Sequence, residues 1–98
     1  FLYLGDTARF PYGDRSAAQL AEFARELAGI LLDRGAKLLV VACNSATAAA
    51  LPALRDELER EVPVVAVVHP ESRLAAGATQ NGRVGLIATP ARTPSFRM

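Results

Sequence analysis

Apolar residues in this chain form short continuous runs, separated by longer stretches in which they recur every three or four positions. Four runs predict strands, at residues 1–4, 38–42, 64–68 and 83–88. The run at 38–42 has no polar alternation, which is typical of a strand covered on both faces of a parallel sheet. The hydrophobic pattern alone therefore predicts a sheet-containing fold.

The stretches between these runs predict helices. After a polar, turn-rich loop at 5–14, an apolar stripe begins beyond Ser16, a plausible N-cap, and stops at Gly35. Residues 46–59 are rich in Ala, Leu and Glu, and predict a second helix that is interrupted and kinked at Pro52.

A shorter helix is expected at 71–78, between a loop at 69–72 and a turn at Asn81-Gly82. Strands and helices thus alternate along the whole chain, which predicts an α/β fold with an open parallel sheet and flanking helices. The loops that follow the strands should converge on one edge of that sheet, where such folds place their ligands.

Cys43, the only cysteine, stands at this edge, directly after a predicted strand and before a predicted helix. Asn44 or Ser45 is expected to cap that helix through its side chain. The partial positive charge at a helix N-terminus favours the thiolate of Cys43, and its free amides could bind a substrate carboxylate. Cys43 is therefore a candidate catalytic base. A free cysteine is also often a small, buried core residue, and the local sequence leaves both interpretations open.

Composition excludes several classes of function. The 98 residues are 51% hydrophobic with a net charge of +1, and the ten arginines and Lys37 are scattered, so neither nucleic acid nor a membrane surface is an expected partner. No apolar run is long enough to span a membrane. A single cysteine cannot form an internal disulfide, which agrees with a cytoplasmic location.

The motifs of common cofactors are missing from the sequence. No His, Cys or carboxylate cluster has metal-ligand spacing, and no glycine-rich phosphate motif follows a strand, so we expect neither metal nor cofactor. His69 is a lone histidine, for which a structural or surface role is expected. The chain starts at Phe1 within a predicted strand, and we interpret it as one incomplete domain cut from a longer protein.

Two motifs resemble those of glutamate racemases. Residues 5–13 read GDTARFPYG, and residues 42–47 read ACNSAT. The second motif alone is similar to the wider aspartate and glutamate racemase superfamily, which includes hydantoin racemases, whereas the first resembles the glutamate enzymes. The runs at 64–68 and 85–89 resemble later strands of the family's first domain.

The resemblance implies cofactor-independent racemisation of glutamate, which supplies D-glutamate for peptidoglycan in the cytoplasm. One cysteine thiolate removes the α-proton and a second thiol protonates the opposite face. Cys43 would be the base that faces D-glutamate. The substrate-binding positions implied by the resemblance are Pro11, Tyr12, Gly13, Asn44, Ser45 and Thr89. Family members often dimerise, so a homodimer is a further expectation.

The chain also departs from the family. The opening strand with its Asp-Ser-Gly loop and the second domain with the other catalytic cysteine are missing, so residues 1–98, as part of the first domain, should be inactive alone. His69 and Glu71 replace an acidic residue and a glycine, and Arg92 replaces a small residue. Two alternatives stay open: a relative that acts on aspartate or another carboxylate, and a noncatalytic α/β module that binds a carboxylate.

Overall fold

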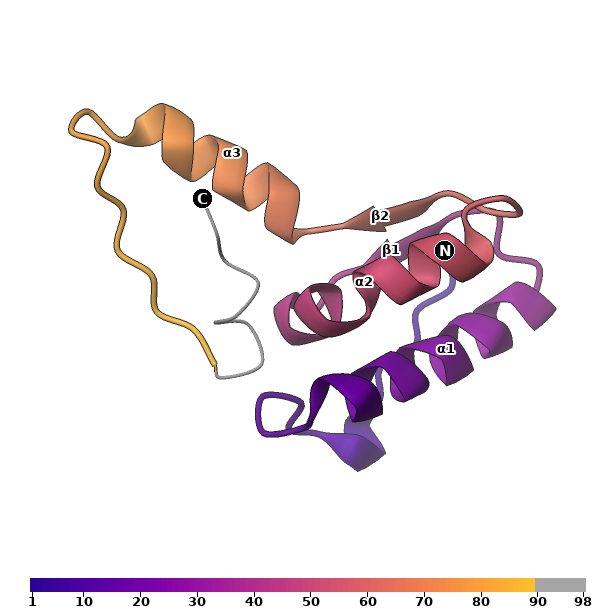
Figure 1. The fold of residues 1–98 in the computed structure, drawn as a ribbon. Helices are drawn as coiled ribbons and strands as arrows, with labels where there is room; N and C mark the ends of the chain where they lie inside the picture. Colours follow the sequence, from indigo (N-terminus) through magenta and orange to yellow (C-terminus); the bar gives the residue numbers. More distant parts are fainter. Residues whose placement is uncertain (90–98) are drawn as a thin grey trace.

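The computed structural model describes residues 1–89 (Figure 1). Its elements follow the predicted alternation of helices and strands. In chain order they are a short 3₁₀ turn η1 (Thr7–Arg9), α1 (Ala17–Asp33), β1 (Leu39–Val41), α2 (Asn44–Leu58), β2 (Val64–Ala66) and α3 (Val68–Ala78).

The two strands form a parallel sheet, in which Leu39 pairs with Val64 and Val41 with Ala66. Helix α1 lies alongside α2, and α2 contacts both strands (Figure 1). A parallel pair joined through a helix is the βαβ unit expected from the alternating pattern. The predicted α/β class with a parallel sheet and flanking helices is confirmed.

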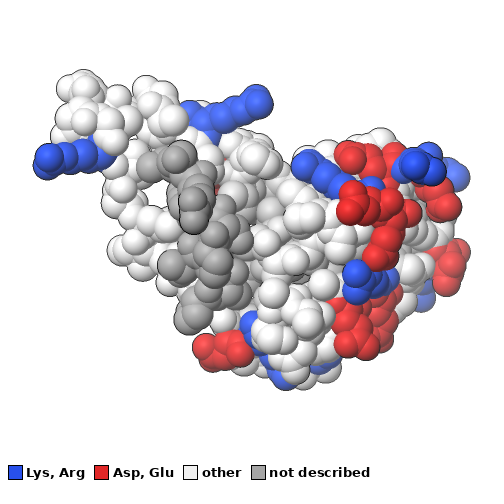
Figure 2. All heavy atoms as spheres, in the orientation of Figure 1, with Lys and Arg blue, Asp and Glu red and all other residues white. Residues whose placement is uncertain are grey.

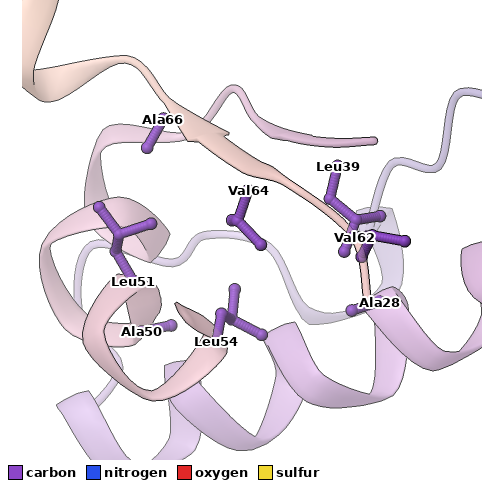
Figure 3. Close-up of a cluster of buried hydrophobic side chains, with 8 residues drawn as sticks. All are labelled: Ala28, Leu39, Ala50, Leu51, Leu54, Val62, Val64 and Ala66. Atoms are coloured by element: carbon purple, nitrogen blue, oxygen red, sulfur yellow. The ribbon is translucent and has the colours of Figure 1, made fainter. Parts of the chain in front are cut away.

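A single apolar core joins α1 and α2 to one face of the sheet. Leu54 of α2 is 2% exposed and Val64 of β2 is 3% exposed, and their side chains point toward each other (Figure 3). The whole cluster consists of Ala28, Leu39, Ala50, Leu51, Leu54, Val62, Val64 and Ala66. Burial of this apolar surface is the main force that holds β1 and β2 to the helices.

The sheet is covered on one face only within the described residues. Leu39 is 5% exposed, whereas its neighbour Val40 is 58% exposed, because successive side chains of a strand point to opposite faces. The expectation of a strand buried on both faces is therefore wrong for residues 1–89.

Two predicted strands, at 1–4 and 83–88, are not strands in the structure. A strand exists only through hydrogen bonds to a neighbour, and neither segment has a strand partner among the described residues. Residues 1–4 instead line one side of a largely apolar groove of about 1060 Å³, which residues 38–43 also line.

The ends of α1 agree with the sequence. The Ser16 hydroxyl accepts from the Gln19 backbone N–H at 3.2 Å, and the Gln19 side chain accepts from the Ser16 N–H at 3.1 Å. This reciprocal pair is a capping box. At the other end Gly35 has a φ of 87°, a left-handed conformation that glycine adopts without strain.

Helix α2 differs from its prediction at two points. Its N-cap is Cys43, with no side-chain capping bond, rather than Asn44 or Ser45. Pro52 lies inside the helix, which continues on both sides, so the expected interruption is wrong. Packing offsets the one hydrogen bond that proline removes, because both Leu51 and Leu54 are buried in the core.

Helix α3 starts earlier than predicted, at Val68, so residues 69–72 belong to its N-terminal part and not to a loop. Pro70 is tolerated there because first-turn N–H groups need no helical partner, and the Ser72 hydroxyl donates to the Val68 carbonyl at 2.9 Å. No residue of α3 is buried. The helix extends away from the rest of the chain (Figure 1).

On the face of the molecule drawn in Figure 2, charged side chains of both signs are interspersed over the part formed by α1 and α2. On the face drawn, this distribution agrees with the scattered charges of the sequence. Within residues 1–89, no helix combines the length and apolar character needed to cross a membrane.

Candidate active site

Cys43 lies where β1 passes into α2. It has extended backbone angles (φ −116°, ψ 124°), and its carbonyl accepts the first helical hydrogen bond, from the Thr47 N–H at 2.9 Å. The thiol is free and partly buried. Cys43 is the N-cap of α2 and its side chain makes no capping bond; the backbone amides of the helix's first turn, which follow it directly, have dipoles that favour a bound anion.

Ser45 and Thr89 come together from positions far apart in the chain. Their hydroxyl oxygens are 3.3 Å apart, and Ser45 is only 9% exposed. Gly13 approaches the same threonine so closely that an added Cβ would lie 3.0 Å from the Thr89 methyl group. Three of the predicted binding residues therefore meet at one point.

Asn44 occupies the first position of α2, between Cys43 and Ser45. Its side-chain oxygen is buried and has no hydrogen-bond partner among the described residues. A buried carbonyl oxygen without a donor is costly, and such an oxygen can accept from a bound ligand.

Tyr12 shares the groove with Cys43. Both residues line it, together with Asp6 from the preceding loop. The phenol donates a hydrogen bond to the Asp6 carboxylate, and the ring packs against Phe23 with centroids 5.9 Å apart. The predicted loop residue and the predicted thiol thus line one cavity.

The environment of Tyr12 keeps its phenol protonated. Burial raises the pKa of Tyr12 above its ordinary value, and the hydrogen bond to Asp6 and the charge of that carboxylate raise it further. The Arg9 charge acts in the opposite direction, and a charge at Cys43 adds a small increase. Tyr12 is therefore a hydrogen-bond donor at neutral pH.

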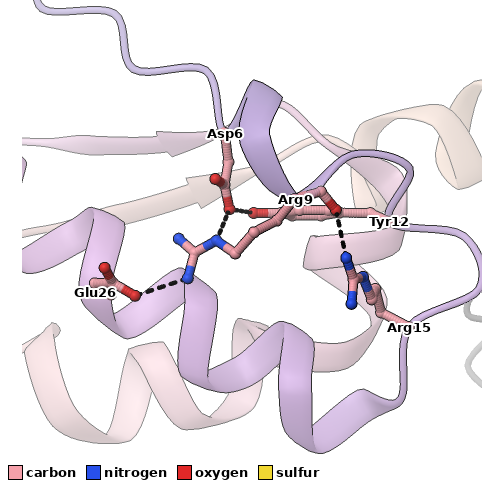
Figure 4. Close-up of polar contacts among 5 residues, drawn as sticks. All are labelled: Asp6, Arg9, Tyr12, Arg15 and Glu26. Carbon is pink, nitrogen blue, oxygen red and sulfur yellow. Dashed lines mark hydrogen bonds and ion pairs between the residues drawn. The ribbon is translucent and has the colours of Figure 1, made fainter.

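Arg9 links this loop to helix α1 (Figure 4). Its Nε atom is 2.7 Å from the Asp6 carboxylate, and its Nη1 atom is 2.7 Å from the Glu26 carboxylate. The hydrogen bond to Glu26 is the main cause that raises the pKa of Arg9. Arg9 thus stays charged and joins two carboxylates.

The other residues singled out from the sequence take less part in the groove, or lie outside the described residues. Pro11 follows a cis peptide bond and is exposed beside Tyr12. His69 is exposed on α3 and is not among the residues that line the groove. Arg92 lies outside the described residues. Across residues 1–89, no three His, Cys, Asp or Glu side chains are grouped so that they could hold a metal ion.

Phe23 and Glu26 are parts of the site that the sequence did not predict. Phe23 falls within the apolar stripe of the first helix, and Glu26 is one of many acidic residues of this chain. Their spacing of three residues places them on one face of α1. The spacing alone does not identify them as site residues, because only the tertiary structure shows that the loop containing Arg9 packs against this face of α1.

Comparisons with known proteins find relatives with similar sequences and similar folds. A glutamate racemase of Listeria innocua is 51% identical over 87 residues, which cover 89% of this chain and 32% of that protein. The structure of glutamate racemase from Aquifex pyrophilus matches with a TM-score of 0.89 and 45% identity, covering 96% of this chain and 36% of that one.

A third match is the structure of glutamate racemase from Francisella tularensis in complex with D-glutamate. It has a TM-score of 0.80 and 36% identity, and covers 93% of this chain and 33% of that one. The chain spans about a third of the length of the curated relatives it matches. The model of the Asp/Glu/Hydantoin racemase family matches residues 2–97, and the chain therefore belongs to that family.

Proposed function

We propose that the complete protein racemises glutamate without a cofactor, and that residues 1–98 are part of its N-terminal domain. The observation that carries the proposal is that Cys43 and Tyr12 line the same groove. Cys43 is also the N-cap of α2, and Ser45 lies in the first turn of that helix. The relatives named glutamate racemase support glutamate as the substrate.

The proposed reaction uses two thiols. The Cys43 thiolate takes the α-proton of D-glutamate, and a second cysteine, outside this chain, gives a proton to the opposite face of the same carbon. In the reverse direction the two groups exchange roles. One proton is removed and one is added, so neither an oxidant nor a cofactor enters the balance.

The other predicted residues would stabilise the anion that forms at the α-carbon. That anion delocalises its charge onto the substrate carboxylate, which needs preorganised donors in a site that excludes water. The first-turn amides of α2 and the hydroxyls of Ser45 and Thr89 are suitable donors. Four further residues would bind the parts of the substrate other than the reacting carbon and its carboxylate: Pro11, Tyr12, Gly13 and Asn44.

The wider role is part of the same proposal. D-glutamate made in the cytoplasm would enter peptidoglycan, and the complete protein would work as a homodimer. Residues 1–98 alone would be inactive, because they contain one thiol and the mechanism needs two.

The test follows deuterium incorporation from solvent at the α-carbon of D- and L-glutamate by the complete protein. Cys43→Ser should abolish exchange mainly from D-glutamate, since a serine hydroxyl ionises far less readily than a thiol and so supplies no comparable anionic base. Ala76→Ser is the matched control, because it adds the same hydroxyl at an exposed position of α3 that does not line the groove. Unchanged exchange in Cys43→Ser would refute the role of Cys43.

The wild-type protein also decides between substrates. Exchange with aspartate or another carboxylate, but with neither enantiomer of glutamate, would replace glutamate as the substrate. Absence of exchange with every amino acid tried, together with binding of a carboxylate, would make the protein a binding module.

A further inference from the structure

The loop at residues 6–15 carries Tyr12 and Gly13 and is attached to helix α1 by a compact set of contacts. We propose that Arg9, Phe23 and Glu26 form a clamp that positions Tyr12 and Gly13 for substrate. The inference rests on the proposed function for the identity of that substrate. The three clamp residues do not line the groove, so they act as positioning residues and do not contact the substrate in this proposal.

Arg9 is the centre of the clamp (Figure 4). Its guanidinium binds Asp6 of the loop through Nε and Glu26 of α1 through Nη1, both at 2.7 Å. The guanidinium carbon also lies 4.0 Å from the centroid of the Phe23 ring. A planar guanidinium can hold two carboxylates at once while it stacks on a ring, which a lysine ammonium cannot do.

Phe23 is the platform beneath the loop. Besides Arg9, its ring contacts the ring of Tyr12, with centroids 5.9 Å apart. The guanidinium of Arg15 lies 5.7 Å from the same centroid and also donates to the Arg9 carbonyl at 3.3 Å. Three residues of the loop, Arg9, Tyr12 and Arg15, therefore lie against one side chain of α1.

The contacts reach the binding residues in two steps. Arg9 holds the Asp6 carboxylate, and that carboxylate accepts the hydrogen bond of the Tyr12 phenol. Tyr12 is adjacent to Gly13, which lies against Thr89, and the Thr89 hydroxyl in turn contacts that of Ser45. The orientation of the groove-lining tyrosine is thus set by two side chains of α1, Phe23 and Glu26, that do not themselves line the groove.

Stability alone does not explain the arrangement. Glu26 is 60% exposed, and exposed ion pairs contribute little to the free energy of unfolding. A pair that orders a binding loop acts differently, because the apparent affinity for a ligand falls with the fraction of protein whose loop is competent to bind. The clamp should therefore affect substrate binding more than folding.

The test compares Glu26→Gln with Glu57→Gln in the complete protein. Glu57 is a matched control, since it also pairs with an arginine of α1, Arg25, at 2.7 Å, but joins α1 to α2 instead of the loop. For Glu26→Gln we expect KM for glutamate to rise about three- to tenfold, with kcat changed less than about twofold. Amide hydrogen exchange at residues 6–15 should rise with it. Glu57→Gln should change neither.

Two further variants sharpen the result. Arg9→Lys keeps the positive charge but loses the paired contacts with Asp6 and Glu26 and the stacking on the Phe23 ring. It should therefore raise KM at least as much as Glu26→Gln. Phe23→Leu keeps an apolar contact but removes the ring, and should also raise loop exchange. Equal effects of Glu26→Gln and Glu57→Gln on KM and exchange would overturn the clamp, as would a loss of kcat at unchanged KM.

The exchange measurement separates this inference from the proposed function. If the wild-type protein does not racemise glutamate, the proposed function fails. Faster exchange at residues 6–15 in Glu26→Gln, with none in Glu57→Gln, would still support a clamp that orders Tyr12 and Gly13. Unchanged exchange in both variants would overturn it.

Discussion

Helices α2 and α3 have similar positions in the chain, each directly after a parallel strand, and very different environments. Six residues of α2 are buried, whereas none of α3 is. Leu54 of α2 is 2% exposed and Leu74 of α3 is 76% exposed. Similar sequences of Ala, Leu and charged residues thus give a core helix in one case and an outlying helix in the other.

This difference in burial between α2 and α3 indicates which parts of the candidate site are held by the core. Cys43, Asn44 and Ser45 stand on α2, which the core holds in place. Thr89 lies beyond α3, at the end of an exposed segment, and reaches the site through its contact with Ser45. A site built partly on a packed helix and partly on an outlying segment should respond differently to changes in the two.

The largest expected effect comes from the core. Leu54→Ala should lower the free energy of unfolding by about 2–5 kcal/mol, because it removes a buried side chain and leaves a cavity between α2 and the sheet. Urea unfolding of the chain, followed by circular dichroism, measures this change. A loss below about 1 kcal/mol would contradict the packing of α2 described above.

The next effect concerns the hydrogen bond between Tyr12 and Asp6. Asp6→Asn should lower the pKa of Tyr12 toward its ordinary value, because it removes the negative charge of the carboxylate that accepts the phenol's hydrogen bond. The difference in phenolate absorbance between each protein and its Tyr12→Phe counterpart isolates this one phenol during a pH titration. An unchanged or higher pKa of Tyr12 would show that Asp6 does not hold the phenol.

The same shift has a consequence for stability. The raised pKa lets the folded chain keep a proton that the unfolded chain loses above about pH 10. The free energy of unfolding should therefore fall as pH rises beyond that value, and less steeply in Asp6→Asn. A steeper fall in the variant would contradict the sign.

A smaller effect is expected where the two regions meet. Ser45→Ala removes the hydroxyl that contacts Thr89 and should cost about 0.5–1.5 kcal/mol. Amide exchange should rise at residues 83–89 and stay unchanged in α2. Increased exchange throughout α2 would mean that Ser45 acts through the core instead.

The smallest effect is expected on α3. Leu74→Ala should change the free energy of unfolding of the chain by less than about 0.5 kcal/mol, since the side chain is exposed. The urea experiment used for Leu54→Ala measures it under the same conditions. A loss as large as that of Leu54→Ala would show that α3 is packed in solution.

Local features of the fold were predictable from the sequence. The capping box at Ser16, the left-handed glycine at Gly35 and the strand that leads into Cys43 all depend on residues within a few positions of one another. The continuation of α2 through Pro52 was not predictable, because core packing outweighs the local preference there.

The candidate site divides in the same way. The sequence by itself determined the alternation of strands and helices and placed Cys43, Asn44 and Ser45 at a strand end, because these depend on periodicity and neighbouring residues. Only the tertiary structure decided that Thr89 meets Ser45, that Arg9 joins Asp6 to Glu26, and that residues 1–4 have no strand partner among residues 1–89. Such contacts join segments distant in the chain, and their free energy depends on where the packed core places the backbone.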